Sequence, residues 1–187
     1  LDLAAAPGLF DRDTVLLRIG IQAVLPPADG AKRPANLVFL IDTSGSMMSA
    51  DKLPLVQYTL SQTLEILEPT DTVAIVTYAG STGVRLPPTP VANSEAILSV
   101  IQSLDVGGST AGAAGLELAY AQAQAGFIEG GINHVLLCTD GDFNVGPSST
   151  AELTAMIEEE RQTGVTLTVL GYGSGNLNDA MMEAVSN

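Results

Sequence analysis

The sequence has too few cysteines, basic residues and long apolar runs for several classes of protein. Cys138 is the only cysteine among 187 residues, so no disulfide can form within the chain. Only 7 basic residues accompany 21 acidic ones, and the net charge of −14 argues against binding nucleic acid or an anionic membrane through a general electrostatic field. No apolar run approaches the roughly 18 to 20 residues of a transmembrane helix. The charge instead favours solubility and the uptake of cations.

Motifs of common nucleotide-binding and hydrolytic enzymes are also missing. Neither the P-loop pattern Gly-x4-Gly-Lys-Ser/Thr nor the nucleophile elbow Gly-x-Ser-x-Gly occurs, and the glycines of residues 171–175 lack the dinucleotide spacing. His134 is the only histidine, so a Ser-His-Asp triad would have to use it. Its place at the entry to an apolar run indicates a structural role.

The composition predicts a folded chain of one domain with an appendage. Hydrophobic residues make up 46% of the sequence and the mean hydropathy is +0.31, which excludes disorder. Residues 14–25 alternate between apolar and polar positions, a pattern typical of a half-buried strand, antiparallel or at a sheet edge. Prolines and glycine at residues 26–34 then break the chain. We therefore separate an N-terminal strand and Pro-rich linker, residues 1–35, from a main domain at 36–187; the strand either completes the main sheet or belongs to a neighbouring domain.

Strands and helices alternate through the main domain. Continuous apolar runs at 37–41, 73–78, 135–138 and 165–170 suit parallel strands that are covered on both faces. Apolar residues recur at helical spacing at 53–67, 97–104 and 116–127, a capping box at Ser149 opens a fourth helix, and a last helix is expected at 178–184. Residues 80–83 predict a turn into a short antiparallel edge strand, 84–86, that Pro87 and Pro88 end. The pattern predicts an α/β fold with a doubly wound, mostly parallel open sheet flanked by helices.

A group of oxygen-bearing residues follows the first of these buried strands. Asp42, Ser44 and Ser46 occupy every second position, so in an extended chain their side chains point the same way and offer oxygens to a hard divalent cation. Thr110 precedes a predicted helix, and Asp140 follows another buried strand. In a doubly wound sheet, ligands bind beyond the carboxyl ends of the strands, so three distant segments can meet at one point there.

These residues resemble the metal-ion-dependent adhesion site of the von Willebrand factor type A (VWA) domain, which has the form Asp-x-Ser-x-Ser, then a distant Thr and a distant Asp. The resemblance covers residues 36 to 187 and is greatest to bacterial exported VWA proteins. It implies a Rossmann-like fold and a site for Mg²⁺ or Mn²⁺. In this reading Ser44, Ser46 and Thr110 bind the metal directly, and Asp42 and Asp140 bind it directly or through water.

The resemblance also implies a function and a location. We expect a non-enzymatic, adhesion-type module that binds an Asp or Glu carboxylate of a protein partner through the metal, in an extracytoplasmic location. No nucleic acid, membrane insertion or catalytic residue is expected. Because the family normally adds one more strand, we expect residues 36–187 to end before the last strand of the domain.

Two alternatives stay open. One is a Mg²⁺-dependent hydrolase or phosphotransferase with Asp42 as nucleophile, although haloacid-dehalogenase-type phosphatases have a second Asp where Ser44 stands and no lysine is obviously positioned to hold a phosphoryl group. The other is a scaffold with a purely structural metal. Cys138, inside an apolar run, is expected to be a small core residue. Met47 and Met48 suit either a contact surface beside the metal loop or core packing.

Overall fold

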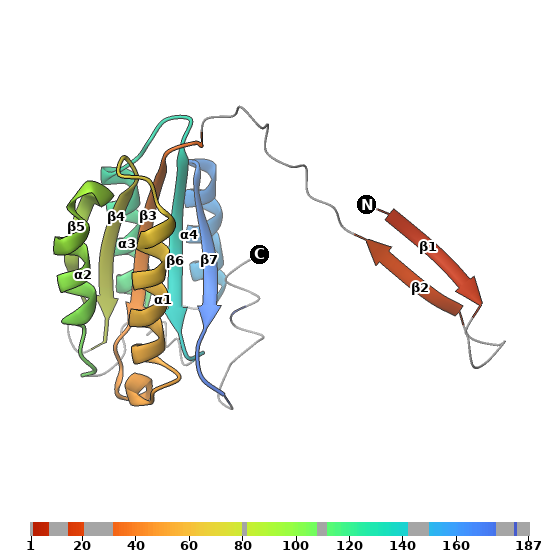
Figure 1. The fold of residues 1–187 in the computed structure, drawn as a ribbon, viewed down its shortest axis with the longest axis horizontal. Coiled ribbons are helices and arrows are strands. Elements are labelled where there is room, and N and C mark those ends of the chain that lie inside the picture. Colours follow the sequence, from red (N-terminus) through yellow and green to blue (C-terminus); the bar gives the residue numbers. More distant parts are fainter. Residues whose placement is uncertain are drawn as a thin grey trace. The chain divides into compact units, whose positions relative to one another are not determined.

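The computed structural model describes residues 2–7, 15–20, 32–79, 82–107, 112–141, 150–174 and 182. The chain divides into two compact units, Leu1–Lys32 and Arg33–Asn187. Figure 1 shows the strands and helices of both units. The predicted turn at 80–83 lies only partly within the described residues, and the predicted helix at 178–184 is described at a single residue.

The first unit contains a two-stranded antiparallel sheet. Strands β1 (Asp2–Pro7) and β2 (Val15–Gly20) pair with Asp2 opposite Gly20 and Pro7 opposite Val15. The predicted strand at 14–25 is β2 over residues 15–20, and residues 21–25 lie outside the described part. Sequence analysis missed β1, because its residues, Asp-Leu-Ala-Ala-Ala-Pro, include only types with little preference for strands apart from the leucine.

The second unit is built on a five-stranded sheet. Its strands lie in the order β5-β4-β3-β6-β7, and β5 alone is antiparallel to its neighbour. This confirms the predicted α/β fold with a mostly parallel sheet. The bounds of these strands are β3 Ala35–Asp42, β4 Thr72–Tyr78, β5 Gly83–Pro90, β6 Ile132–Thr139 and β7 Val165–Gly171.

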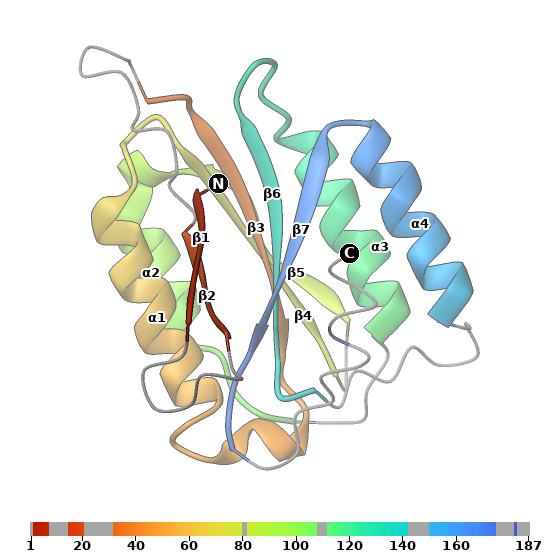
Figure 2. The ribbon, with the colours of Figure 1, turned by 90° about the vertical axis from the view of Figure 1, so that its right-hand side faces the viewer.

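Helices cover both faces of this sheet, as Figure 2 shows. One apolar core lies between the sheet and helices α1 and α2, and a second lies between the sheet and helices α3 and α4. The two cores alternate along β3, with Phe39 and Ile41 in the first and Val38 and Leu40 in the second. The helices are α1 Leu53–Ile66, α2 Ser94–Gln102, α3 Gly112–Ala125 and α4 Thr150–Gln162, with 3-10 turns η1 Gly45–Met48 and η2 Val91–Asn93.

The edge strand is longer than predicted. β5 runs from Gly83 through Pro87 and Pro88 to Pro90, whereas the sequence analysis ended it at residue 86. Proline has no N–H to donate to a neighbouring strand, and a central strand needs such donors toward both of its neighbours. Because β5 pairs only with β4, the hydrogen bonds lost at its prolines cost little stability. The prediction was wrong because it treated these prolines as strand breakers without regard to the strand's place at the edge.

The topology brings two predicted site residues to one edge of the sheet. From β3 the chain goes first to β4 on one side and later to β6 on the other, so the strand order reverses beside β3. Asp42 ends β3, and Asp140 follows the end of the adjacent parallel strand β6. Ligands of doubly wound sheets bind at such a reversal.

Among the described residues, no helix combines the length and apolar character that crossing a bilayer requires.

Gly115 of α3 fixes how closely the helix approaches the strand beside the site. A Cβ atom there would lie 2.7 Å from Tyr78 Cβ and 3.2 Å from Leu40 Cδ1. We expect Gly115→Ala to lower the free energy of unfolding, because overpacking costs about 1 to 3 kcal/mol and outweighs the roughly 1 kcal/mol gained in helix propensity. Urea denaturation measures the change. Ala114→Gly, at an exposed position of the same helix, is the control for propensity alone; a Gly115→Ala protein more stable than the parent would contradict the close approach.

Candidate metal site

The first part of the site is the turn that connects β3 to α1. Asp42 is the last residue of β3, Ser44 precedes η1, and Ser46 is the second residue of η1. The hydroxyl oxygens of Ser44 and Ser46 lie 2.8 Å apart. The Met47 amide donates to the Ser44 carbonyl at 3.0 Å, which closes the turn and keeps both hydroxyls on one side of it. Alternate positions in the sequence therefore do place two oxygens together, although the second lies on a 3-10 turn rather than an extended chain.

The Asp42 carboxylate is fully buried and held by three neighbours. Its Oδ1 accepts a hydrogen bond from the Ser44 amide at 2.8 Å, and its Oδ2 accepts from the Tyr78 hydroxyl at 3.1 Å and the Thr139 hydroxyl at 3.4 Å. Burial raises the pKa of Asp42 despite these donors, and the charge of Asp140 adds to the rise. The pKa of Tyr78 is raised well above its usual value, mainly by burial and then by the Asp42 charge, so Tyr78 stays a donor.

The Asp140 carboxylate is likewise fully buried, at the end of β6. Lys52 Nζ donates to Asp140 Oδ2 at 2.8 Å and to the Ser46 carbonyl at 3.1 Å. The next residue, Gly141, has φ of 94° and donates its amide to Thr139 Oγ1 at 3.1 Å, so the chain turns sharply beyond the strand. The two carboxylates thus stand at the ends of neighbouring strands, and both lack exposed surface.

Thr110, the fifth predicted ligand, lies outside the described residues, as do Gly108 and Ser109. The segment that leads to it is attached to the site: the Gly107 amide donates to the Thr43 carbonyl at 2.8 Å, inside the Asp-x-Ser-x-Ser turn. On the other side of the gap, α3 begins at Gly112. The structure therefore brings together Asp42, Ser44, Ser46 and Asp140, and the position of Thr110 stays a prediction.

The donor set suits a hard divalent cation. Every side-chain donor atom of these four residues is an oxygen, and Mg²⁺ and Mn²⁺ prefer oxygen ligands. Adjacent ligands at 2.0–2.1 Å around an octahedral ion lie about 2.9 Å apart, close to the 2.8 Å between the Ser44 and Ser46 hydroxyls. Among the described residues, no group of three or more His, Cys, Asp and Glu side chains could hold a metal ion. The residues present fit such an ion.

Three residues around the site were not among the ligands that the sequence analysis predicted. Tyr78 and Thr139 bond the Asp42 carboxylate, and Lys52 bonds Asp140. Tyr78 is the last residue of β4 and Thr139 the last residue of β6, so the register of these strands with β3 would have indicated both once the strand order was known. Nothing in the spacing of Lys52 distinguishes it from a solvent-exposed lysine.

Other residues weighed from the sequence have structural positions. His134 lies on β6 and its ring nitrogens contact the hydroxyls of Thr166 and Thr168, while burial lowers its pKa. Cys138 is a fully buried core residue, and burial raises the pKa of its thiol to about 12. Met47 is also fully buried, but Met48 is 68% exposed. One methionine therefore packs in the core, and the other faces solvent beside the metal loop.

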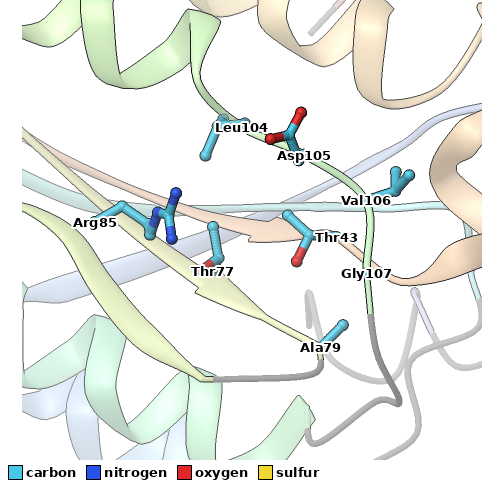
Figure 3. Close-up of a pocket in the computed structure, with 8 residues that line it drawn as sticks. All are labelled: Thr43, Thr77, Ala79, Arg85, Leu104, Asp105, Val106 and Gly107. Atoms are coloured by element: carbon cyan, nitrogen blue, oxygen red, sulfur yellow. The ribbon is translucent and has the colours of Figure 1, made fainter.

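A polar cleft of about 460 Å³ adjoins the site and is drawn in Figure 3. Thr43, which lies between Asp42 and Ser44, forms part of its wall, and Gly107 forms another part. Arg85 of β5 and Asp105 line the same cleft, and neither side chain forms an ion pair with the described residues. Ala79 on its rim has φ of 127°, an unusual backbone conformation for a residue with a Cβ. The remaining lining residues are Thr77, Leu104 and Val106.

Comparison with known proteins identifies the fold and relatives of the chain. The von Willebrand factor type A domain family model matches residues 36–187. The uncharacterized protein YfbK of Escherichia coli (strain K12) is 46% identical over 183 residues, which cover 97% of this chain and 32% of YfbK. The chain therefore spans about a third of that relative's length.

Solved structures with the same fold include two with a metal. Proximal thread matrix protein 1 from the mussel byssus, with a zinc-occupied metal-ion-dependent adhesion site, has a TM-score of 0.68 and 20% identity over 83% of this chain and 42% of its own. Manganese-loaded TRAP protein of Plasmodium vivax has a TM-score of 0.64 and 21% identity, with coverages of 82% and 62%. An aerotolerance-related membrane protein from Bacteroides fragilis has a TM-score of 0.66 and 21% identity, with coverages of 81% and 86%.

The Tyr78 hydroxyl is a support of Asp42 that a conservative substitution can remove. Tyr78→Phe takes away the donor 3.1 Å from a buried carboxylate, so we expect the free energy of unfolding to fall by about 1 to 3 kcal/mol. Urea denaturation of the metal-free protein measures the loss. Tyr58→Phe makes the same chemical change at a residue that is 63% exposed and should be neutral within about 0.5 kcal/mol. Equal effects at both positions would mean that Tyr78 does not support Asp42.

Proposed function

The chain belongs to the von Willebrand factor type A domain family, and on that premise we propose that residues 36–187 are a metal-dependent protein-interaction module. In this proposal Asp42, Ser44, Ser46, Thr110 and Asp140 hold Mg²⁺ or Mn²⁺, and an Asp or Glu carboxylate of a partner completes the coordination. The single observation that supports the proposal is that two serine hydroxyls lie 2.8 Å apart in the turn after the buried Asp42, while the buried Asp140 follows the adjacent strand at the edge where the strand order reverses.

The choice of ligand chemistry follows from charge. Serine and threonine hydroxyls are neutral, so two carboxylates at most balance the dication, and Lys52 already offsets part of the charge of Asp140. A bound dication would supply a Lewis-acidic centre with a position for an anionic oxygen. The zinc and manganese in the two related structures support a divalent ion at such a site; the preference for Mg²⁺ or Mn²⁺ rests on the all-oxygen donor set.

The surface around the site offers further contacts to a partner. Met48, 68% exposed, lies next to the metal loop and can adapt its side chain to an apolar group. The adjacent cleft, which Thr43 helps to line, presents the Arg85 guanidinium, which can donate hydrogen bonds to a second carboxylate or a main-chain carbonyl of the same partner. An acidic segment of a protein is the partner that this combination favours.

Binding without catalysis fits the environment of Asp42 better than a hydrolytic role. A nucleophilic aspartate needs a free carboxylate oxygen that faces the substrate, but both Asp42 oxygens accept hydrogen bonds from protein groups and the side chain has no exposed surface. We therefore propose that the module is not an enzyme. We also propose an extracytoplasmic location, by analogy with the aerotolerance-related membrane protein that shares the fold.

Metal binding should stabilise the folded protein by mass action. We expect millimolar Mg²⁺ or Mn²⁺ to raise the melting temperature, with a contribution of about 2.7 kcal/mol when the free metal is at 100 times its Kd. Asp42→Asn should abolish the increment while leaving the metal-free melting temperature unchanged or higher, because burial disfavours the Asp42 charge. Differential scanning calorimetry in metal and in chelator measures both. Asp105→Asn, an exposed carboxylate of the adjacent cleft, is the matched control and should keep the increment.

Carboxylate capture separates the interaction module from a scaffold with a structural metal. We expect short peptides that contain one Asp or Glu to bind in Mn²⁺ and to lose binding in chelator, whereas Asn and Gln versions of the same peptides bind in neither. Fluorescence anisotropy of labelled peptides measures this, and the Asp42→Asn protein supplies the background. Metal binding together with indifference to Asp and Asn peptides would favour the structural metal, and turnover of phosphoesters that Asp42→Asn abolishes would favour the hydrolase.

A further inference from the structure

Lys52 stands where the local structure of the chain disfavours a lysine. It is the residue before the first turn of α1, and no side-chain hydrogen bond caps that helix end. The amino end of a helix carries partial positive charge, so a cation there is unfavourable, and Ser, Thr, Asp or Asn is preferred because it can cap. Only two of the seven basic residues of the protein are lysines, Lys32 and Lys52. A conflict between local preference and the residue present indicates that the side chain is used elsewhere.

The Lys52 side chain reaches across the candidate metal site. It is 12% exposed, and its ammonium lies 2.8 Å from Asp140 Oδ2 and 3.1 Å from the carbonyl oxygen of Ser46. One cation thereby contacts both the segment after β6 and the turn after β3, the same two segments that a divalent ion would join. Because Asp140 has no exposed surface, this ion pair is shielded from the screening that weakens surface pairs.

Room for the lysine stem is built into the exit of β7. Gly173 has φ of 88°, and a Cβ atom there would lie 2.5 Å from Lys52 Cε and 3.1 Å from Lys52 Cγ. A side chain at residue 173 would therefore displace Lys52 from its course to Asp140. The stem passes along a third segment of the sheet edge, which holds the ammonium in place rather than leaving it to move in solvent.

We propose that Lys52 is a built-in counter-cation of the metal site: it holds Asp140 in the metal-free protein and competes with the divalent ion for that carboxylate. The inference rests on the metal site of the proposed function. The two ionised carboxylates and the ammonium together carry a net charge of minus one, so the site attracts a dication less strongly than Asp42 and Asp140 alone would. With the dication bound, the same groups sum to plus one, which strengthens the attraction for a partner carboxylate.

Opposite effects on two affinities distinguish this role from a merely structural one. Without the Lys52 charge, the site should bind metal more tightly and an acidic ligand more weakly. A lysine that only supports the fold would change both affinities in the same direction when replaced. The sign of the two changes therefore reports on charge and not on damage to the site.

The test is a calorimetric titration of the wild-type protein and of variants with MnCl2. We expect Lys52→Met and Lys52→Gln to bind Mn²⁺ about tenfold more tightly, since loss of an ammonium a few ångströms away changes the energy by at least about 1.4 kcal/mol. At saturating Mn²⁺, the same variants should bind an Asp-containing peptide several-fold more weakly. Lys52→Arg keeps the charge, so its Mn²⁺ affinity should stay within about threefold of the wild-type value, well short of the roughly tenfold change expected for the neutral variants.

Arg33→Gln is the matched control, because it removes a positive charge at an exposed position just before β3, at the end of that strand away from the site. Its Mn²⁺ affinity should stay close to that of the wild type. If Lys52→Met does not fold without metal, the Mn²⁺ affinity of Lys52→Gln, which keeps a hydrogen-bond donor, tests the inference instead. If the wild type binds Mn²⁺ and Lys52→Gln binds it equally or more weakly, the inference about Lys52 is wrong but the proposed function stands. If the wild type does not bind Mn²⁺, both the inference and the proposed function are wrong.

Discussion

Burial of two carboxylates at the ends of adjacent parallel strands is the constraint that organises this domain. Asp42 and Asp140 have no exposed surface, and ionised carboxylates are costly to remove from water. The structure meets that cost with the Ser44 amide and the Tyr78 and Thr139 hydroxyls around Asp42, and with the Lys52 ammonium at Asp140. Two acidic side chains are thereby held together, away from water, at one edge of the sheet.

The two apolar cores make such an edge rigid. β3 lies at the centre of the sheet and is packed on both faces, with Ile41 and Leu40 in opposite cores immediately before Asp42. Gly115 lets α3 approach Tyr78 closely, which fixes the ring whose hydroxyl bonds the Asp42 carboxylate. Apolar packing directly behind the site thereby determines where the Asp42 oxygens stand.

Much of the fold could be predicted because the relevant forces act locally. The continuous apolar runs at β3, β4, β6 and β7 reflect strands that are covered on both faces of the sheet. The helical spacing of the buried residues of α1 reflects a helix that packs on one face only; these residues are Leu53, Val56, Leu60 and Leu64. Predictions were wrong where a residue's effect depends on its neighbours in space. The prolines of β5 are tolerated only at a sheet edge, and β1 forms through pairing with β2 rather than through strand preference.

The sequence by itself determined the alternation of strands and helices and the oxygens of Asp42, Ser44, Ser46 and Asp140, because hydrophobic periodicity and the placement of residues after buried strands are visible in one dimension. Only the tertiary structure decided that Asp42 and Asp140 end neighbouring strands, that Tyr78 and Thr139 hold Asp42, and that Lys52 reaches Asp140. Strand order and the course of a long flexible side chain depend on packing between segments 36 to 97 residues apart, for which the sequence carries no local signal.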